Sequence, residues 1–432
     1  MTGTIKKVHA REIFDSRGLP TIEVEILLED GSLARAAAPC GTSRGKSEAF
    51  DLRDGDPSYF NGFGVHKAIA NVNTEIADQL KGRDAIDQEE IDKVLIELDG
   101  TEDKSRLGGN SIIATSIANA KVAALSKGVQ LFEFLGGGRD IPIPLIYVMF
   151  GGPAFVGLPG VCDFQEYNLI PLTARSYKEG FIWSCRIQKR LSEMMAWKKK
   201  SGVPRYAKLA GILTAQFNSN DEAFIAITKA IEEEGFLPGK DFGIYIDIAA
   251  SELYREGKYH LNADGKIVSR EEMIDQLEDM CERFPIVCME DCLFEEDWEG
   301  WMLLTERLGY KVQLIGDDLF VTNRKRLVKG IEMGAANGLV IKPNQVGTLT
   351  EAIETIMVAK EARYGTVISI RSGELWDPYI VHLCVGQNLG QGKIVGAYAT
   401  GETNMNELLR VEDYLGEKSV YRGKEVLSRF LQ

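Results

Sequence analysis

The clearest pattern in this chain is a series of short apolar runs in its second half, each ending at or next to a residue able to do chemistry. The runs are Phe242–Asp247, Ile286–Glu290, Val312–Asp317, Gly338–Lys342 and Gly365–Ser369, the last leading into Arg371. Such runs are typical of parallel strands buried on both faces. The successive steps from Asp247 to Glu290, from Glu290 to Asp317 and from Asp317 to Lys342 are 43, 27 and 25 residues. The last two fit one strand-plus-helix unit each, and the first leaves room for an extra hairpin-like excursion.

The first half of the chain has a different pattern. Residues 4–38 alternate strand-like runs with turns, and Thr21–Leu28 has period-two patterning before the hairpin signal Glu29–Gly31. Residues 63–125 are largely helical in pattern. We therefore predict a small α+β domain over residues 1–135, a Gly- and Pro-rich linker near 136–144, and a parallel α/β domain over 140–432.

Composition and charge narrow the functional classes. The 432 residues are 44% hydrophobic, enough for a large core, and carry a net charge of −14. An acidic chain argues against a nucleic-acid surface, which needs clustered Lys and Arg. No run of 18 apolar residues and no signal-peptide pattern occurs, so we expect a soluble cytoplasmic protein without a membrane partner. The seven scattered cysteines lack C-x-x-C spacing and are expected to be reduced.

Three carboxylates at successive strand ends predict a metal site. In a parallel barrel, the carboxyl ends of the strands converge on one mouth, where the chemistry sits. Asp247, Glu290 and Asp317 would meet there, and Mg²⁺ prefers such oxygen ligands. The alternative is that each residue caps the helix after its strand, as Asp often does. Asp318 is the weaker candidate of its pair and could cap the next helix.

Lys342 and Arg371 extend this site toward a reaction. Close to a metal and other cations, the Lys342 ammonium would be pushed toward its neutral form and could act as a base. The alternative is a salt bridge to one of the three carboxylates. Arg371 and Ser372, followed by Gly373, suit a phosphate or a second carboxylate. The loop Thr42–Lys46 could close over the mouth, and it lacks the spacing of a nucleotide-binding P-loop.

Several long segments resemble the enolase family over nearly the whole chain. They are residues 10–25 (AREIFDSRGLPTIEVE), 98–101 (LDGT), 104–110 (KSRLGGN), 289–291 (MED), 316–323 (GDDLFVTN), 342–349 (KPNQVGTL) and 371–374 (RSGE). The resemblance implies a small α+β N-terminal domain followed by a modified (β/α)8 barrel whose first units depart from strict alternation. It also implies Mg²⁺ as cofactor, a small phosphorylated or phosphonylated carboxylate as substrate, and a homodimer or larger homo-oligomer.

The resemblance also assigns roles to individual residues. The metal ligands fall on Asp247, Glu290 and Asp317, the base falls on Lys342, the phosphate contacts fall on Arg371 and Ser372, and the loop serine that joins a second magnesium falls on Ser43. Gln165 and Glu166 match the family's Gln-Glu pair, with Gln165 expected at the substrate and Glu166 among the catalytic groups.

Four expected partners of the reaction are absent from the matching positions. Two family histidines fall on Ala154 and Ile370, and the glutamate that helps hydroxide to leave falls on Gln216, where flanking identity is low. The lysine that holds the substrate carboxylate falls on Ile394. Lys393 is one residue away, and a one-residue slip turns a strand side chain to the other face, so we expect it not to substitute.

The chain's own histidines stand at none of these positions, and His382 is expected in the core. The retained residues predict deprotonation next to a carboxylate, while loss of hydroxide needs an acid that the site lacks. We therefore predict a divergent enzyme that forms or uses a metal-stabilised enolate, with carboxyphosphonoenolpyruvate synthesis in phosphonate biosynthesis as one candidate reaction. One alternative is an ordinary enolase that converts 2-phosphoglycerate to phosphoenolpyruvate, with an acid such as Glu166. The other alternative is a catalytically silent relative that acts by binding or assembly.

Overall fold

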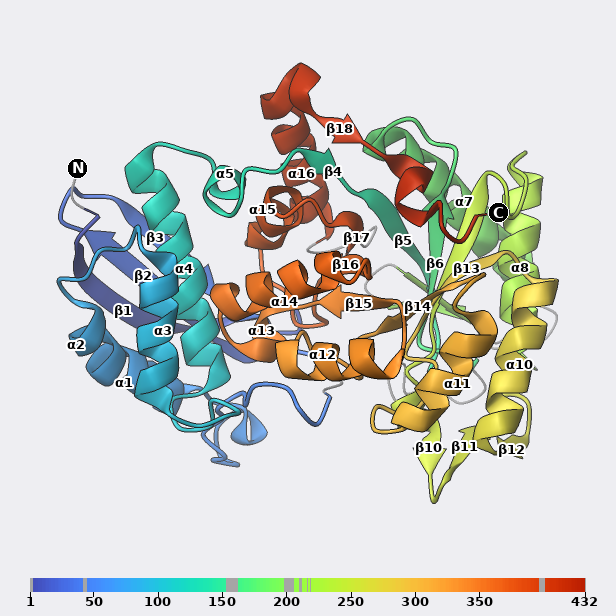
Figure 1. The fold of residues 1–432 in the computed structure, drawn as a ribbon, viewed down its shortest axis with the longest axis horizontal. Coiled ribbons are helices and arrows are strands. Elements are labelled where there is room, and N and C mark those ends of the chain that lie inside the picture. Colours follow the sequence, from blue (N-terminus) through green and yellow to red (C-terminus); the bar gives the residue numbers. More distant parts are fainter. Residues whose placement is uncertain are drawn as a thin grey trace.

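The computed structural model describes residues 3–41, 45–152, 162–197, 206–209, 212–215, 217, 219–395 and 401–431. The N-terminal part, blue in Figure 1, begins with an antiparallel sheet of β1 (Ile5–Phe14), β2 (Pro20–Leu28) and β3 (Leu33–Ala37). Alternate residues of β2 are buried, as the period-two pattern predicts. The predicted hairpin after Leu28 is confirmed, and the Asp30 carboxylate accepts the Ser32 N–H there at 2.8 Å.

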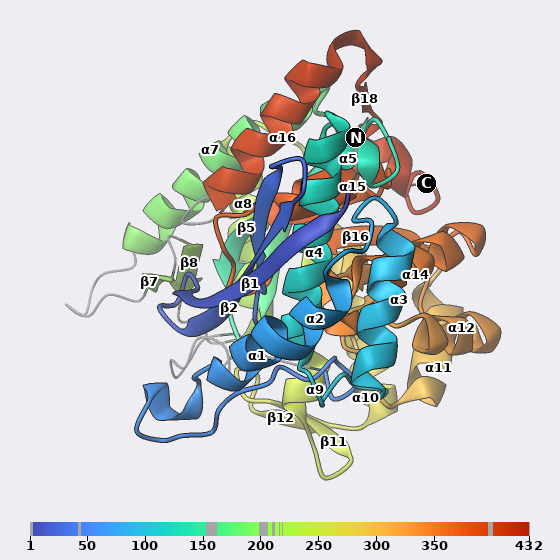
Figure 2. The same cartoon turned by 90° about the vertical axis from the view of Figure 1, so that its left-hand side faces the viewer.

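Five α-helices among the described residues belong to this part. They are α1 (His66–Asn71), α2 (Ala77–Leu80), α3 (Gln88–Asp99), α4 (Gly109–Lys127) and α5 (Leu131–Phe134). Helices α1, α2 and α4 lie on one face of the sheet (Figure 2), and α3 and α5 pack against α4. Most residues of α4 are buried because this helix lies between the sheet and the rest of the molecule. It ends at Gly128 in the left-handed conformation that glycine adopts without steric cost.

The second part contains a closed barrel of eight strands. In chain order they are β5 (Ile143–Phe150), β6 (Glu166–Pro171), β9 (Phe242–Asp247), β13 (Ile286–Glu290), β14 (Gln313–Gly316), β15 (Gly338–Ile341), β16 (Gly365–Ser369) and β17 (Gly390–Val395). Pairing of β17 with β5 closes the ring. Strand β6 runs antiparallel to both of its neighbours, β5 and β9, while the other neighbouring pairs are parallel. The predicted modified barrel is therefore confirmed.

Helices surround the barrel, a pair of strands extends its sheet, and a small separate sheet lies outside it. The helices are α7 (Tyr177–Trp197), α8 (Asn220–Glu233), α9 (Ala250–Leu253), α10 (Arg270–Arg283), α11 (Trp298–Leu308), α12 (Arg324–Met333), α13 (Pro343–Val346), α14 (Leu349–Glu361), α15 (Tyr379–Gly386) and α16 (Gly401–Leu415). Strands β7 (Tyr206–Leu209) and β8 (Ile212–Ala215) add to β5, and β10 (Tyr254–Arg255), β11 (Lys258–Leu261) and β12 (Lys266–Val268) form a separate sheet. None of the helices in the described part of the chain has the length and apolar character needed to cross a membrane.

The linker is itself tied into the structure. Strand β4 (Asp140–Ile141) lies inside the predicted linker and pairs with β18 (Val420–Tyr421) near the C-terminus. A core of strand and helix side chains runs through both parts, and a second apolar cluster consists almost entirely of barrel-strand residues such as Leu145, Val340 and Val367. The barrel is thus a filled scaffold that fixes the ends of its strands.

Candidate active site at the carboxyl ends of the barrel strands

The barrel register brings the predicted chemical residues to one edge. Asp247 and Glu290 are the last residues of β9 and β13 and are direct partners in the ladder. Asp317 follows the last residue of β14, and Lys342 follows the last residue of β15. Because all four strands are parallel, their side chains gather at the same mouth.

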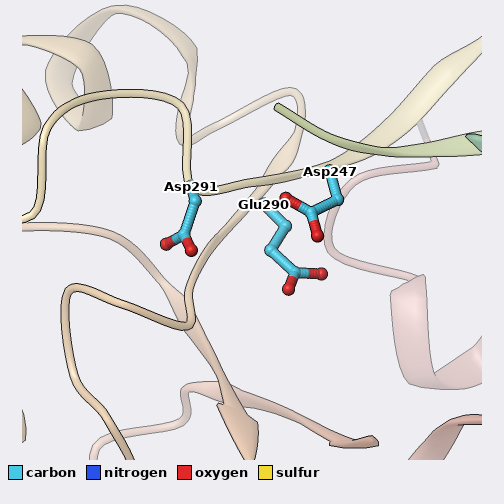
Figure 3. A group of neighbouring side chains, drawn as sticks. All are labelled: Asp247, Glu290 and Asp291. Atoms are coloured by element: carbon cyan, nitrogen blue, oxygen red, sulfur yellow. The ribbon is translucent and has the colours of Figure 1, made fainter. Parts of the chain in front are cut away.

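Asp247 and Glu290 form the most buried part of the site. They are 4% and 0% exposed, and Figure 3 shows them together with Asp291. Burial and the charge of Glu290 raise the pKa of Asp247 well above its ordinary value. Glu290 Oε1 is buried and has no hydrogen-bond partner among the described residues. Crowded carboxylates with an unpartnered oxygen fit a divalent cation, which would supply the missing positive charge.

The structure adds an acidic residue that the sequence reasoning left without a role. Oxygen atoms of Asp247, Glu290 and Asp291 lie within 4.8 Å of one another, and so do those of Asp291, Asp317 and Asp318. Asp291 therefore links Asp317 to the other two predicted ligands. Its carboxylate accepts the backbone N–H of Asp317 at 2.9 Å and of Asp318 at 3.0 Å, which holds the end of β14 in place.

Asp317 and Lys342 form an ion pair at the end of β14 and β15. The Lys342 ammonium contacts Asp317 Oδ2, and the side chains are 13% and 10% exposed. Gln345 Nε2 donates to the other oxygen, Oδ1, at 2.8 Å. Burial acts to lower the pKa of Lys342, but the charge of Asp317 outweighs it and raises that pKa. The expected lowering of the Lys342 pKa is thus not produced by the chain's own charges, and the salt bridge named as the alternative is present.

The contacts of Lys393 contradict the expectation that its side chain faces away from the mouth. Lys393, not Ile394, points into the mouth: its side chain is 2% exposed, and its Nζ lies 2.6 Å from Glu290, 2.9 Å from Glu166 and 3.6 Å from Asp247. Ile394 is buried in the large apolar core instead. Burial acts to lower the pKa of Lys393, but the charges of Glu166 and Glu290 outweigh it and raise that pKa well above its ordinary value.

Gln165 and Glu166 also lie in this part of the mouth. Glu166 begins β6 and is the ladder partner of Asp247, and its carboxylate pairs with Lys393. Gln165 Nε2 lies 3.4 Å from Asp247 Oδ2, at the outer limit of a hydrogen bond, and its backbone N–H donates to the Asp247 carbonyl at 2.9 Å. Both residues therefore adjoin the same metal-ligand candidate.

Arg371 and Ser372 follow β16 on the side of the mouth that faces the N-terminal part. Arg371 is 5% exposed, whereas Ser372 is exposed. The guanidinium of Arg371 bonds to the Glu48 carboxylate at 3.0 and 3.2 Å. Burial acts to lower the pKa of Arg371, and Glu48 outweighs it, so the group is a fixed cation. Like Asp291, Glu48 was not assigned a role from the sequence.

The departures from the family pattern can be placed only in part. Ile370 is half-buried and packs against Tyr147 and Phe150, so an apolar side chain occupies the end of β16 where a histidine was expected. Ser43, Ala154 and Gln216 lie outside the described residues.

Comparison with known protein families covers almost the whole chain. The model described as enolase, N-terminal domain, matches residues 5–135. The model described as enolase, C-terminal TIM barrel domain, matches residues 139–430. The two matches meet at the segment that contains β4 and leads from α5 into the barrel.

Proposed function

The chain belongs to the enolase family, and we propose that it forms or uses a metal-stabilised enolate of a small phosphorylated or phosphonylated carboxylate. One observation carries the proposal. Two lysines, the partly buried Lys342 and the buried Lys393, enter the mouth from β15 and β17, and each forms an ion pair with the proposed metal-ligand set. Enolate formation needs a base and a cation that stabilises the enolate charge. The lysines can supply the base, and the acidic cluster could hold the cation.

The proposed roles follow from this arrangement. Mg²⁺ held by Asp247, Glu290 and Asp317 would neutralise the charge that develops on an enolate. Lys342 takes the proton next to the substrate carboxylate. The negative charge of Asp317 raises the pKa of Lys342, so Lys342 would become a usable base when Asp317 binds the metal instead. Lys393 keeps its charge because Glu166 and Glu290 surround it, which suits it to hold the substrate carboxylate.

Loss of hydroxide is the part of the ordinary reaction that has the weakest support. Ile370 cannot donate a proton, and Ala154 and Gln216 replace two further family residues. We therefore favour a reaction without hydroxide loss, of which carboxyphosphonoenolpyruvate synthesis is one candidate. Lys393 restores one of the four missing partners, and that specific observation favours the second candidate, an ordinary enolase using Glu166. The silent relative is the weakest candidate, because the acidic cluster and both lysines are retained.

A direct test uses purified protein, Mg²⁺ and 2-phosphoglycerate. We expect turnover to be low or absent, while the proton next to the carboxylate exchanges with D₂O and K342M stops this exchange. Phosphoenolpyruvate formation at the rate of ordinary enolases would contradict the altered reaction. Absence of turnover, exchange and calorimetric Mg²⁺ binding together would contradict enolate chemistry and favour the silent relative. We also propose a cytoplasmic homodimer or larger homo-oligomer, which sedimentation can test for its size.

A further inference from the structure

A buried ion pair joins the N-terminal part of the molecule to the mouth of the barrel. Glu48 Oε2 accepts from Arg371 Nη1 at 3.0 Å, and Glu48 Oε1 accepts from Arg371 Nη2 at 3.2 Å. The two side chains are only 7% and 4% exposed. A bidentate arginine–carboxylate pair fixes both distance and plane, unlike a contact made through a single atom.

Glu48 also has contacts that do not involve Arg371. Its Oε1 accepts the backbone N–H of Gly45 at 3.1 Å, at the point where the described chain resumes after residues 42–44. Gln345 Nε2, which donates to the proposed metal ligand Asp317, lies 3.5 Å from the same oxygen. The backbone N–H of Ala49 donates to the Gln345 carbonyl at 2.7 Å. Glu48 is therefore held in place independently of Arg371.

We propose that Glu48 is the positioning residue that orients the Arg371 guanidinium toward the phosphate or phosphonate group of the substrate. This inference rests on the proposed function, which assigns Arg371 to that group. Glu48 bonds to both Nη atoms, and Asn344 Oδ1 also accepts from Nη1 at 3.3 Å. The two-point contact with Glu48 fixes the plane of the guanidinium and therefore the direction in which it can meet an anion. Without this carboxylate, the buried guanidinium would lose its bonded counter-charge and the contact that fixes its plane.

The chain offers a matched control for this role. Lys104 and Glu351 form another ion pair between the N-terminal part and the barrel, with an N–O distance of 2.9 Å and side chains 6% and 25% exposed. This pair does not include Arg371. E351Q therefore removes a carboxylate from the contact between the two parts and leaves the proposed anion site unchanged.

The test measures binding of inorganic phosphate in saturating Mg²⁺ by calorimetry. Partners that orient metal ligands typically contribute about 10- to 100-fold in affinity, and we expect E48Q to weaken phosphate binding by a similar factor. E351Q should bind phosphate as the wild type does. E48D keeps the charge on a side chain one methylene shorter and should lose less affinity than E48Q.

A double variant separates orientation from a general effect on folding. If Glu48 acts through the fork of Arg371, E48Q should weaken phosphate binding far less in an R371K background, because lysine has no fork to orient. Equal losses in both backgrounds, or unchanged phosphate binding in E48Q, would overturn this inference alone. Absence of phosphate binding in the wild type would instead remove the assignment of Arg371 to the substrate, and this inference with it.

Discussion

The two lysines of the barrel mouth make an informative pair. Lys342 follows β15, is 13% exposed and contacts one carboxylate, Asp317. Lys393 lies on β17, is 2% exposed and has three carboxylates within 3.6 Å, those of Glu290, Glu166 and Asp247. Both lysines have raised pKa values, but only for Lys393 is the shift large.

The difference teaches how one site can hold two ammonium groups for different purposes. A lysine paired with one carboxylate becomes a usable base when that carboxylate binds a metal ion. The carboxylate then no longer stabilises the ammonium form, and the pKa of the lysine falls. A lysine among three carboxylates keeps its proton even if one of them binds a cation. Lys342 is thus suited to move a proton, and Lys393 to remain a fixed positive charge.

The largest expected effect comes from removing the proposed base. K342M should lower the rate of substrate proton exchange into D₂O by about 10²- to 10⁴-fold, the usual contribution of a positioned acid or base. Exchange is followed by NMR at saturating Mg²⁺. K393M serves as the matched control, because it removes a lysine from the same mouth. Exchange that survives in K342M and disappears in K393M would reverse the assigned roles.

The second test concerns stability and should affect Lys393 most. K393M leaves the buried Asp247 and Glu290 and the partly buried Glu166 without their cation, and breaking buried ion pairs costs about 3–5 kcal/mol. We expect a lower urea midpoint for K393M than for K342M, which leaves a single carboxylate that still bonds to Gln345. Mg²⁺ should raise the midpoint of K393M more than that of the wild type. If K342M and K393M have the same urea midpoint, the proposed difference between the two lysines is contradicted.

The third test asks which side of the mouth holds the metal. D247N should weaken calorimetric Mg²⁺ binding by about tenfold or more, since it removes a charged ligand beside Lys393. Asp318 belongs to the second acidic group, on the side of Lys342, and D318N should have the smaller effect. If D318N weakens binding more than D247N, Asp318 holds the metal in preference to Asp247, which contradicts the proposed ligand set.

The sequence predicted the barrel well because parallel strands leave a strong pattern, but it misplaced Lys393. The prediction placed the family lysine at Ile394 and expected the one-residue slip to turn Lys393 to the other face of the strand. The register of β17 pairs Lys393 with Ser369 and turns it inward. A signal was available: Gln391 and Lys393 alternate with Gly392 and Ile394, and alternate strand positions share a face.

Asp291 and Glu48 could not be assigned from pattern for different reasons. Asp291 stands next to a predicted ligand, so an acidic pair at a strand end was visible, but its bonds to the backbone of Asp317 and Asp318 depend on how neighbouring strands end. Glu48 meets Arg371 across 323 positions of sequence, between the two parts of the molecule. Periodicity reports which face of an element is buried, and it carries no information on such contacts.

The smallest expected effect on stability concerns an ion pair outside the mouth, which serves as a reference for the effect of K393M. His382, which the sequence placed in the core, is 8% exposed on α15, and its Nε2 lies 3.2 Å from Glu407 on α16. The hydrogen bond from His382, with help from Arg410, lowers the pKa of Glu407 to about 2. The ordinary glutamate pKa is about 4.3, so the stabilisation is complete above that pH and is lost as the pH falls toward 2.

E407Q should therefore lower the free energy of unfolding by about 1 kcal/mol or less at pH 6, because the pair is partly exposed to solvent. The difference between E407Q and the wild type should shrink as the pH falls from 5 to 3, as measured by urea unfolding at each pH. E306Q, at an exposed position of α11, should show no such trend. A loss in E407Q as large as in K393M would mean that the three carboxylates around Lys393 add nothing beyond one ordinary ion pair, and the contrast between the two lysines would lose its physical basis.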